Sequence, residues 1–453
     1  MYFERAEQQK RLAYMFHEFE KFQGPFLKYP KYIHITGPLG SGKTTFVKHF
    51  AEEHNGFYFF CRNLTADMAI RLLAERLSEL TETEITAKNW QDIITAFAVN
   101  RAHFNSVLIL DDVDLLLQDD EFQEMLLYTA SHYIPHRLFL IVVSRQMKFE
   151  EVFLDYEDRE TFYLRKMNIE MRYYAIADIV KLFPKVGSEN QLCLFALTGG
   201  IPALVHALPS DIDATEALDC CLSSDAFRTF AEQVFRALFR APESYMTLCY
   251  AIALSKHRNS EIARFAGYAP NKCDKYLKAL VEGGITKKNK KTGSYDFANP
   301  YYNFWFKYVY PGKKAPAPEE AEQVLKQRAE EGYKQACMNY VYYKLARLYS
   351  IGSLKEAIVL KGSDPDIKIG DVVFEFDSDE GFCKAAIQFY DEPYLGKKDL
   401  AWILDEIVLT YRPYMDAVFL FVRGRYAEGI IRDFKKRHAF DHLYMITPKG
   451  LRY

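Results

Sequence analysis

The sequence lacks the cysteine pattern that a zinc site or a disulfide framework needs. Its eight cysteines form no CxxC pair and show no cysteine–histidine ligand spacing. It also has no apolar run near the roughly 18 residues of a membrane span. The first residues, MYFERAEQQKRLAY, are charged from the start, which does not fit a signal peptide. We therefore expect a cytoplasmic protein whose cysteines are reduced core residues.

An excess of charge of either sign is also missing, since the formal net charge is −3 over 453 residues. Global electrostatics therefore do not draw this protein to nucleic acid, and any such contact must come from a local patch. Hydrophobic residues make up 49% of the chain, with 35 Phe and 32 Tyr, which favours folded structure over most of its length. A chain this long predicts about three domains.

What the sequence does contain is a phosphate-binding loop. Residues 37–44, GPLGSGKT, match the pattern GxxxxGK[ST] in full. The β-rich run YIHIT precedes them, and TTFVKHFAEEH follows with the apolar spacing of a helix. We expect Lys43 to reach the β- and γ-phosphates of ATP and the Thr44 hydroxyl to ligate Mg²⁺. The predicted nucleotide-binding residues of the loop are Gly37, Pro38, Gly40, Ser41, Gly42, Lys43, Thr44 and Thr45.

Acidic residues follow the next strongly apolar run, SVLILDDVDLLL. We expect Asp111 to anchor Mg²⁺ through water and Asp112 to orient the attacking water. The run RLFLIVVSRQ ends at Ser144 and Arg145, and Arg145 could sense the γ-phosphate or simply cap the edge of a sheet. The predicted catalytic residues are Lys43, Asp111, Asp112 and Arg145.

Strand and helix patterns alternate through this region, with GFYFFCRN as a strand and ADMAIRLLAERLSEL and NWQDIITAFAVNRAH as helices. This alternation predicts an α/β fold, a parallel sheet with helices on both faces. No NKxD-type guanine-reading loop is present in the sequence, which favours ATP.

The run QLCLFALTGGIPALVHAL carries a GGxP motif that ends at Pro202. Its position beyond the second acidic strand resembles the lid motif of the STAND ATPases, and the chain is similar to the prokaryotic and archaeal members of that class. The resemblance implies that Pro202 lies against the adenine. It also implies that a winged helix and a restriction-endonuclease-like domain follow the lid. The alternative for GGIP is an ordinary helix C-cap followed by proline. Departures from the family are Pro38-Leu39 in the loop and Asp111-Asp112 in place of Asp-Glu.

Residues 260–288 have the layout of a helix-turn-helix with Gly267 in the turn and Ser260 as a helix N-cap. One apolar face of the second helix is expected to hold Cys273, Tyr276, Leu277 and Leu280. A β-hairpin wing follows, which carries Lys287, Lys288, Lys290 and Lys291. These lysines and those of the second helix suit DNA phosphates. A winged helix that packs against protein explains the pattern equally well.

The last part of the chain reads as a long helix and then strands, which is typical of a PD-(D/E)xK nuclease. That chemistry needs two acids for Mg²⁺ and a lysine. Asp371 stands where the first acid belongs, but Gln388-Phe389-Tyr390 puts tyrosine in the lysine's place, and neither Lys384 nor Lys397 is a preferred substitute. The prediction is a degenerate domain without nuclease activity. The basic run FKKRHAF is typical of a solvated helix end.

The predicted organisation is an ATPase core (1–165), a helical lid (166–230), a winged helix (231–310), a linker (311–322) and an endonuclease-like domain (323–453). The predicted function is a STAND-type switch that binds and hydrolyses ATP with Mg²⁺. Two alternatives stay open, a DNA-binding regulator and an ATP-gated, metal-dependent DNA nuclease. A protein partner or self-association is compatible with each.

Overall fold

The structure is a computed structural model and describes residues 5–21, 32–131, 138–145, 168–289, 292–310, 318–348, 358–360, 372–378, 381–392, 394–410, 416–427, 429–438 and 440–451. The chain forms two compact units, Met1–Tyr173 and Tyr174–Tyr453. The first unit runs past the boundary predicted at residue 165 because a short strand, Asn168–Glu170, pairs with the strand before the phosphate loop.

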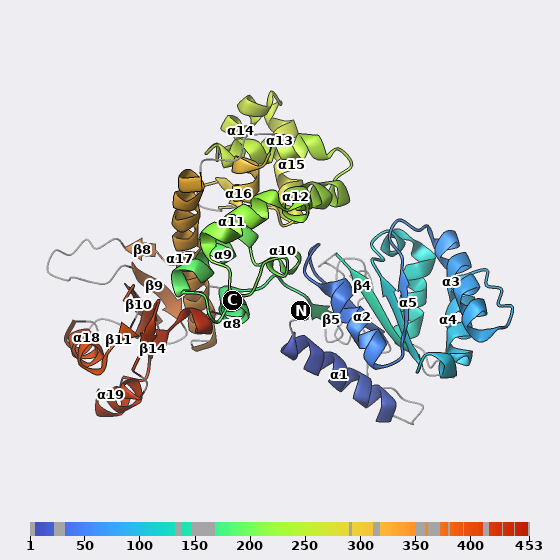
Figure 1. The fold of residues 1–453 in the computed structure, drawn as a ribbon, viewed down its shortest axis with the longest axis horizontal. Coiled ribbons are helices and arrows are strands. Elements are labelled where there is room, and N and C mark those ends of the chain that lie inside the picture. Colours follow the sequence, from blue (N-terminus) through green and yellow to red (C-terminus); the bar gives the residue numbers. More distant parts are fainter. Residues whose placement is uncertain are drawn as a thin grey trace. The chain divides into compact units, whose positions relative to one another are not determined.

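The first unit is an α/β domain (Figure 1). Its strands are β1 (Tyr32–Thr36), β2 (Phe57–Phe60), β3 (Val107–Asp111), β4 (Phe139–Ser144) and β5 (Asn168–Glu170). Its helices are α1 (Ala6–Lys21), α2 (Lys43–Glu53), α3 (Ala66–Thr81), α4 (Trp90–Val99) and α5 (Asp120–Ser131), with short 3₁₀ turns at Arg101–His103 and Leu116–Gln118. The strands lie in the order β2-β3-β4-β1-β5, and all neighbours are parallel. The predicted parallel sheet is therefore confirmed.

Helices cover both faces of this sheet because alternate strand residues point to opposite sides. On one side Leu108 and Leu140 pack with apolar residues of α3, α4 and α5. On the other side Ile109 and Ile141 pack with α1 and α2, where the Phe16 ring meets the rings of Phe50 and Phe139. The strands β3 and β4 are buried along their whole length, which explains why the sequence shows continuous apolar runs there.

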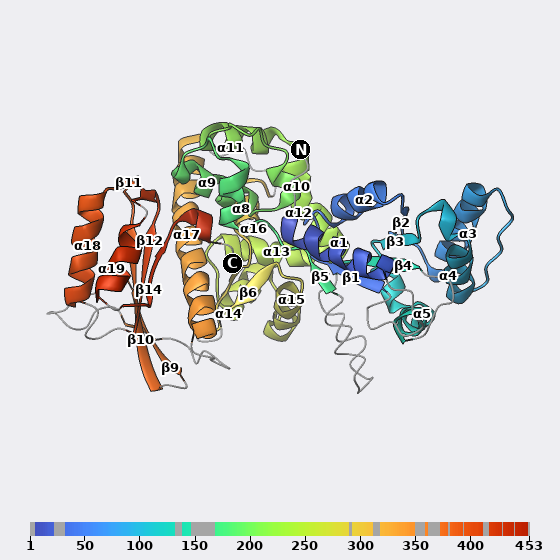
Figure 2. The same cartoon turned by 90° about the horizontal axis from the view of Figure 1, so that it is seen from below.

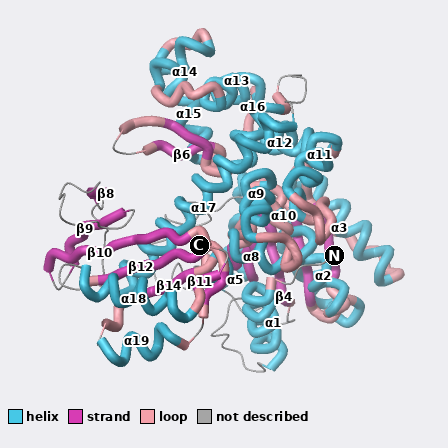
Figure 3. The backbone as a smooth tube through the Cα atoms, turned by 60° about the vertical axis from the view of Figure 1, so that its left-hand side comes forward, coloured by secondary structure: helices cyan, strands magenta, loops and turns pink. Residues whose placement is uncertain are grey.

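The second unit begins with helices. They are α8 (Ile176–Leu182), α9 (Ser188–Thr198), α10 (Pro202–Val205), α11 (Ala214–Ser223), α12 (Asp225–Leu238), α13 (Pro242–Ala253), α14 (Asn259–Ala266), α15 (Pro270–Glu282) and α16 (Pro300–Tyr308). Between α15 and α16 lies an antiparallel hairpin of β6 (Thr286–Lys288) and β7 (Tyr295–Phe297), which Figure 3 shows beside the helices. On α15 Cys273, Leu277 and Leu280 are buried and Tyr276 is half-buried, so the predicted apolar face is confirmed.

A mixed sheet follows the long helix α17 (Pro318–Leu348). Its strands lie in the order β14-β12-β10-β9-β8, with bounds Leu443–Ile446, Ala417–Val422, Gly381–Tyr390, Val372–Ser378 and Ile358–Leu360. A separate pair joins β11 (Tyr394–Leu395) to β13 (Arg425–Tyr426). Figure 2 shows α17 on one side of the sheet and α18 (Lys397–Thr410) and α19 (Ile430–His438) on the other. A 3₁₀ turn, Pro448–Gly450, lies near the end.

Some local predictions need adjustment. The helix α17 begins at Pro318, inside the predicted linker, because proline suits the first helical position and Glu319 and Glu320 follow it in the first turn. Ser260 is not a helix N-cap. The helix α14 begins one residue earlier, and the Glu261 carboxylate accepts the backbone N–H groups of residues 257 and 258 at 3.2 and 3.1 Å.

The cysteine prediction is confirmed, because all eight cysteines are free thiols and only Cys220 is not fully buried. In the described part of the chain, no helix is long and apolar enough to span a membrane.

Candidate functional site

The phosphate loop joins the carboxyl end of β1 to the first residue of α2. Gly37 and Gly42 have φ values of 153° and 89°, which side chains disfavour. A Cβ atom at Gly37 would lie 2.1 Å from the Met171 carbonyl oxygen, so no other residue fits there. The helix α2 starts at Lys43, directly after Gly42, and thus presents its amino end to the loop.

Side chains from outside the motif hold this loop in place. The Tyr173 hydroxyl donates a hydrogen bond to the Leu39 carbonyl oxygen at 2.9 Å. The Arg5 guanidinium donates to the Ser41 carbonyl oxygen at 3.1 Å. The sequence alone did not single out Arg5 or Tyr173, because both lie far along the chain from the GxxxxGK[ST] motif.

Lys43 folds back onto the loop. Its ammonium donates to the carbonyl oxygens of Gly37 at 2.7 Å and Pro38 at 2.9 Å. Burial lowers the pKa of Lys43 to about 8, while the charges of Asp114, Asp111 and Asp112 act in the opposite direction. The lysine therefore stays mostly protonated at neutral pH. It is already close to the turn where phosphate oxygens are predicted to bind.

The two predicted acids lie at the carboxyl end of β3. Asp111 is buried and accepts a hydrogen bond from the Tyr58 hydroxyl at 2.8 Å. Asp112 has a left-handed backbone, with φ of 59°, and its carboxylate contacts Arg62 Nε at 2.5 Å and Arg145 Nε at 3.7 Å. Burial raises the pKa of Asp112, but hydrogen bonds from Arg62 and Asp114 and the charge of Arg145 outweigh burial and lower it. The Asp112 carboxylate is thus kept ionised.

A third acid, Asp114, organises the end of β4 and was missed at the sequence level. Its carboxylate accepts the Arg145 main-chain N–H at 3.0 Å and Arg145 Nε at 3.0 Å. Burial raises the pKa of Asp114 against the opposing charge of Arg145. Because β4 lies between β1 and β3, this pair sits at the sheet edge between the loop and Asp111. No local pattern marked Asp114, because its role depends on the contact with Arg145, which lies 31 residues further along the chain.

The strand ends are also joined by a buried histidine. His34 on β1 and Ser144 on β4 are hydrogen-bonded, with 2.7 Å between Nε2 and Oγ. Burial lowers the pKa of His34 to about 3, so the ring is neutral at physiological pH. This bond adds a side-chain link between β1 and β4, which are already paired in the sheet, near the loop and Arg145.

The GGIP turn lies in the second unit. Gly199 and Gly200 have φ values of 63° and 66°, Gly199 caps α9, and Pro202 opens α10. The local structure matches a C-cap glycine followed by proline. The side chain of Asn299 also lies close to this turn. Its amide donates a hydrogen bond to the Gly199 carbonyl oxygen at 2.8 Å. The predicted contact of Pro202 with adenine stays a prediction.

The remaining predicted residues fall in different places. Thr44 is half-buried and Thr45 is exposed on α2. Lys287 and Lys288 are exposed on β6, while Lys290 and Lys291 lie outside the described residues. Asp371 also lies outside them, and so does the side chain of Lys384. Lys397 opens α18, and the Tyr390 hydroxyl donates to Gln388 Oε1 at 2.8 Å.

The first unit fits a nucleotide and its metal chemically. Ser41 Oγ is fully buried and has no hydrogen-bond partner among the described residues, which is unusual for a buried hydroxyl. It lies in the curled loop of a motif whose backbone N–H groups bind phosphate oxygens. Among the described residues, no group of three or more His, Cys, Asp or Glu forms a ready metal cage.

Part of this chain matches a known family, and several solved structures are similar to it. Residues 27–153 match the family model described as AAA domain. Among solved structures, the chain is similar to a Walker-type ATPase of Pyrococcus abyssi, with 14% identity, 67% of this chain and 96% of that chain covered, and a TM-score of 0.49. It is also similar to the ORC2 protein of Aeropyrum pernix in ADPNP–ADP complexes, with 12% identity, coverage of 73% and 96%, and a TM-score of 0.45.

A third similar structure is Cdc6p from Pyrobaculum aerophilum, with 12% identity, coverage of 72% and 94%, and a TM-score of 0.31. These likenesses are too distant to assign a function to this chain. No curated protein matches the chain. The AAA domain match and the complete phosphate loop define the first unit as a P-loop ATPase domain of the AAA type. Through this domain the chain is a nucleotide-binding, ATP-hydrolysing enzyme.

Proposed function

We propose that this ATPase is a nucleotide-operated switch of the STAND kind, in which the state of the bound nucleotide controls the second unit. The observation that supports this most is the pair of residues at which one unit passes into the other. Tyr173 donates its hydroxyl proton to the phosphate loop at Leu39, and Tyr174 donates its main-chain N–H to the Gly200 carbonyl oxygen at 2.7 Å. Consecutive residues thus attach to the phosphate loop and to the GGIP turn.

This arrangement offers a mechanical route for the switch. A loop that rearranges around phosphate would move its Leu39 carbonyl and hence Tyr173. The next peptide would transmit that movement to the GGIP turn, where Gly200 has no room for a side chain. A Cβ atom there would lie 2.0 Å from the Tyr174 carbonyl oxygen. Two states that differ in γ-phosphate contacts would then differ in how the second unit is presented.

The catalytic roles follow from the positions of the side chains. Lys43 would exchange its two loop carbonyls for the β- and γ-phosphate oxygens. Thr44 and Asp111 would hold Mg²⁺, which neutralises charge on the phosphates when it is bound. Asp112 would orient the attacking water and accept its hydrogen bond, since its carboxylate is ionised. Arg145, held by Asp114, would respond to the γ-phosphate.

The helical part of the second unit is proposed to be a winged helix. Support comes from the order α13, α14, α15 and then the β6–β7 hairpin. Asn271, Lys272, Lys275 and Lys278 are all exposed on α15. A gel-shift assay with duplex DNA would separate the two uses of such a module. Loss of a shift on changing Lys287 and Lys288 to Glu would favour DNA contact, and the absence of any shift would favour protein packing.

Light scattering and limited proteolysis with ATP, with ADP and without nucleotide test the switch. We expect ATP to change the oligomeric state or the cleavage pattern of the second unit, and Lys43→Ala to abolish that change. Tyr173→Phe should keep ATP binding but weaken the response of the second unit, because only the hydroxyl contact is lost. A second unit that behaves identically in all three nucleotide states would rule out the switch and leave the ATPase assignment intact.

A further inference from the structure

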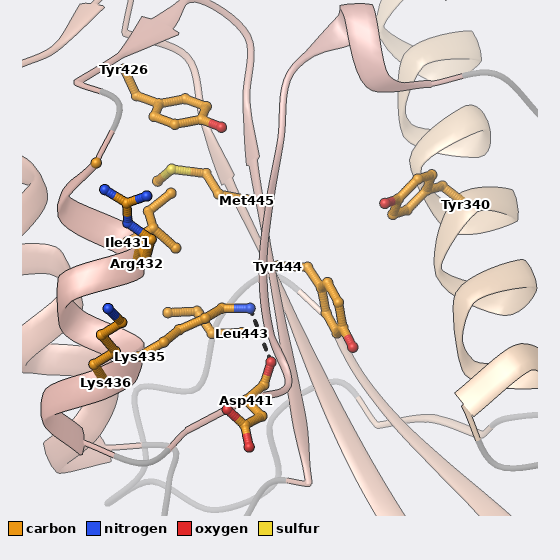
Figure 4. A pocket seen from close by; sticks show the side chains of 11 residues that line it. Tyr340, Tyr426, Ile431, Arg432, Lys435, Lys436, Asp441, Leu443, Tyr444 and Met445 are labelled. Carbon is orange, nitrogen blue, oxygen red and sulfur yellow. Dashed lines mark hydrogen bonds between the residues drawn. The ribbon is translucent and has the colours of Figure 1, made fainter.

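A concave pocket lies along the outer edge of β14, far along the chain from the phosphate loop. It has a volume of about 570 Å³ and is lined by side chains of α17, α19 and β14 (Figure 4). Among the described strands, β14 is the last of its sheet and pairs only with β12. Figure 4 shows Tyr444 and Tyr340 on one side of this strand and Tyr426, Arg432 and Lys435 on the other.

Two lysines converge at this edge. The ammonium of Lys344, from α17, lies 5.3 Å from the centre of the Tyr444 ring, and that of Lys435, from α19, lies 5.2 Å from it. Lys435 donates to the main-chain carbonyl oxygen of Asp441 at 3.0 Å. Neither lysine forms an ion pair with a carboxylate in the described part of the chain. Two like charges from opposite sides of a sheet are therefore held over one aromatic ring.

The charges of the two lysines influence each other. Burial lowers the pKa of Lys435, the charge of Lys344 lowers it further, and only Asp441 acts in the opposite direction. A phosphate bound at either lysine would offset this effect, because hydrogen bonds from an ammonium to an anionic oxygen are charge-assisted.

Further cations extend the same surface. Arg432 and Lys436 line the pocket, are exposed, and lie one helical turn apart on α19. They too form no ion pair among the described residues. Asp441 is the one carboxylate of the described lining. A local excess of positive charge thus occurs in a chain whose net charge is −3.

The upper part of the pocket is apolar. The Tyr426 ring, Ile431 and Met445 lie together at the end of the pocket away from Lys436 (Figure 4). Aromatic and apolar surface beside a row of cations suits a ligand that alternates flat rings with phosphates. A duplex would present neither an unstacked base nor a backbone that enters a pocket of this size. An acidic peptide would match the charge but leave the aromatic part without a planar partner.

We propose that this edge of the sheet binds single-stranded nucleic acid, with phosphates at Lys344, Lys435 and Arg432 and a base against Tyr426. The site is separate from the phosphate loop and from the β6–β7 hairpin. It gives the basic run of α19 a role beyond a solvated helix end. The binding needs no nucleotide hydrolysis, so it stands or falls independently of the switch.

Fluorescence anisotropy of the full chain with a labelled 20-nucleotide oligo(dT), over a range of NaCl concentrations, tests the site. The variant Lys344→Gln/Lys435→Gln should bind about tenfold or more weakly, with a salt slope smaller by about 0.7 for each lysine removed. Lys10→Gln/Lys88→Gln removes two exposed charges from the first unit and should bind like the unchanged protein. Tyr426→Leu should weaken binding several-fold without changing the salt slope, because it removes stacking alone.

Arg432→Gln/Lys436→Gln provides a second test at exposed positions, in case the half-buried Lys435 is needed for folding. Thermal unfolding and ATP hydrolysis of every variant should match those of the unchanged protein. No binding of oligo(dT), or an equal loss in the Lys10/Lys88 control, would overturn the proposal. Poly-glutamate that competes as well as oligo(dT) at equal charge would also overturn it, and would identify an acidic protein segment as the occupant.

Discussion

The side chain of Asn299 touches the backbone of Gly199, one hundred residues earlier in the chain. Its amide donates to the Gly199 carbonyl oxygen at 2.8 Å, and its side-chain oxygen accepts the Tyr301 main-chain N–H at 3.0 Å. Asn299 thus caps α16 and holds the GGIP turn at the same time. The GGIP motif and the Asn-Pro motif form one structural unit, which ties the predicted lid segment to the helix that closes the proposed winged helix.

Gly199→Ala should destabilise the second unit by about 2 kcal/mol or more, because φ there is 63° and the new Cβ would lie 1.8 Å from Asn299 Oδ1. Asn299→Ala alone should cost about 1 kcal/mol as a lost helix cap. In the Asn299→Ala background, the alanine at 199 should cost clearly less. Chemical denaturation of the four proteins gives this double-mutant cycle, and strictly additive costs would argue against the contact.

Arg145→Ala should destabilise the first unit by about 3 kcal/mol, because it removes the guanidinium that pairs with the buried Asp114 carboxylate and leaves only the main-chain N–H of residue 145. Asp114→Asn in the same chain should restore much of that stability. ATP hydrolysis should stay low in both variants, since neither holds an arginine at the end of β4. Denaturant unfolding and a phosphate-release assay measure the two effects separately. An Arg145→Ala protein with normal turnover would show that Arg145 only fastens the sheet edge.

Asp112→Asn should keep ATP affinity within a few-fold but slow hydrolysis by about 100-fold or more, because a neutral amide orients the attacking water less strongly than a carboxylate. Asp111→Asn should instead weaken binding of ATP in Mg²⁺ and have little effect on binding without metal. Calorimetry and a phosphate-release assay, both with and without Mg²⁺, distinguish these roles. Identical defects in the two variants would contradict the division of labour between the acids.

The first unit should lose stability as the pH falls below 6.5. The folded-state pKa of His34 is lowered to about 3, so its contribution is present above the unfolded value of about 6.5 and is lost as the pH drops toward 3. Between pH 6.5 and pH 5 the expected loss is about 2 kcal/mol, before most carboxylates titrate. His34→Gln, which keeps a group near Ser144, should lack this loss. Equal pH dependence in both proteins would show that His34 is not the titrating group.

The sequence predicted the ATPase unit well because its chemistry is local. The phosphate loop, β3 and β4 are contiguous patterns, and the order of strand and helix dictates a parallel sheet. Asp114, Arg62 and Tyr173 could not be found in the same way. Each of them contacts a residue that is distant in the sequence and close only in the folded chain.

Less of the second unit could be predicted from the sequence. Helix and strand types followed from periodicity, and the apolar face of α15 was correct. The contact between Asn299 and Gly199 and the converging lysines at β14 depend on packing between distant segments. The acid at 371 lies outside the described residues, so the nuclease-like reading of this part stays a prediction.

The most direct test is isothermal titration calorimetry of ATP with Mg²⁺ into the unchanged chain and into Lys43→Ala, with thermal unfolding to show that both are folded. One ATP should bind the unchanged chain, and the alanine variant should show no measurable binding, because it lacks the one lysine of residues 37–44. Equal binding by both proteins, or none by either, would contradict the assignment of residues 37–44 as the nucleotide site.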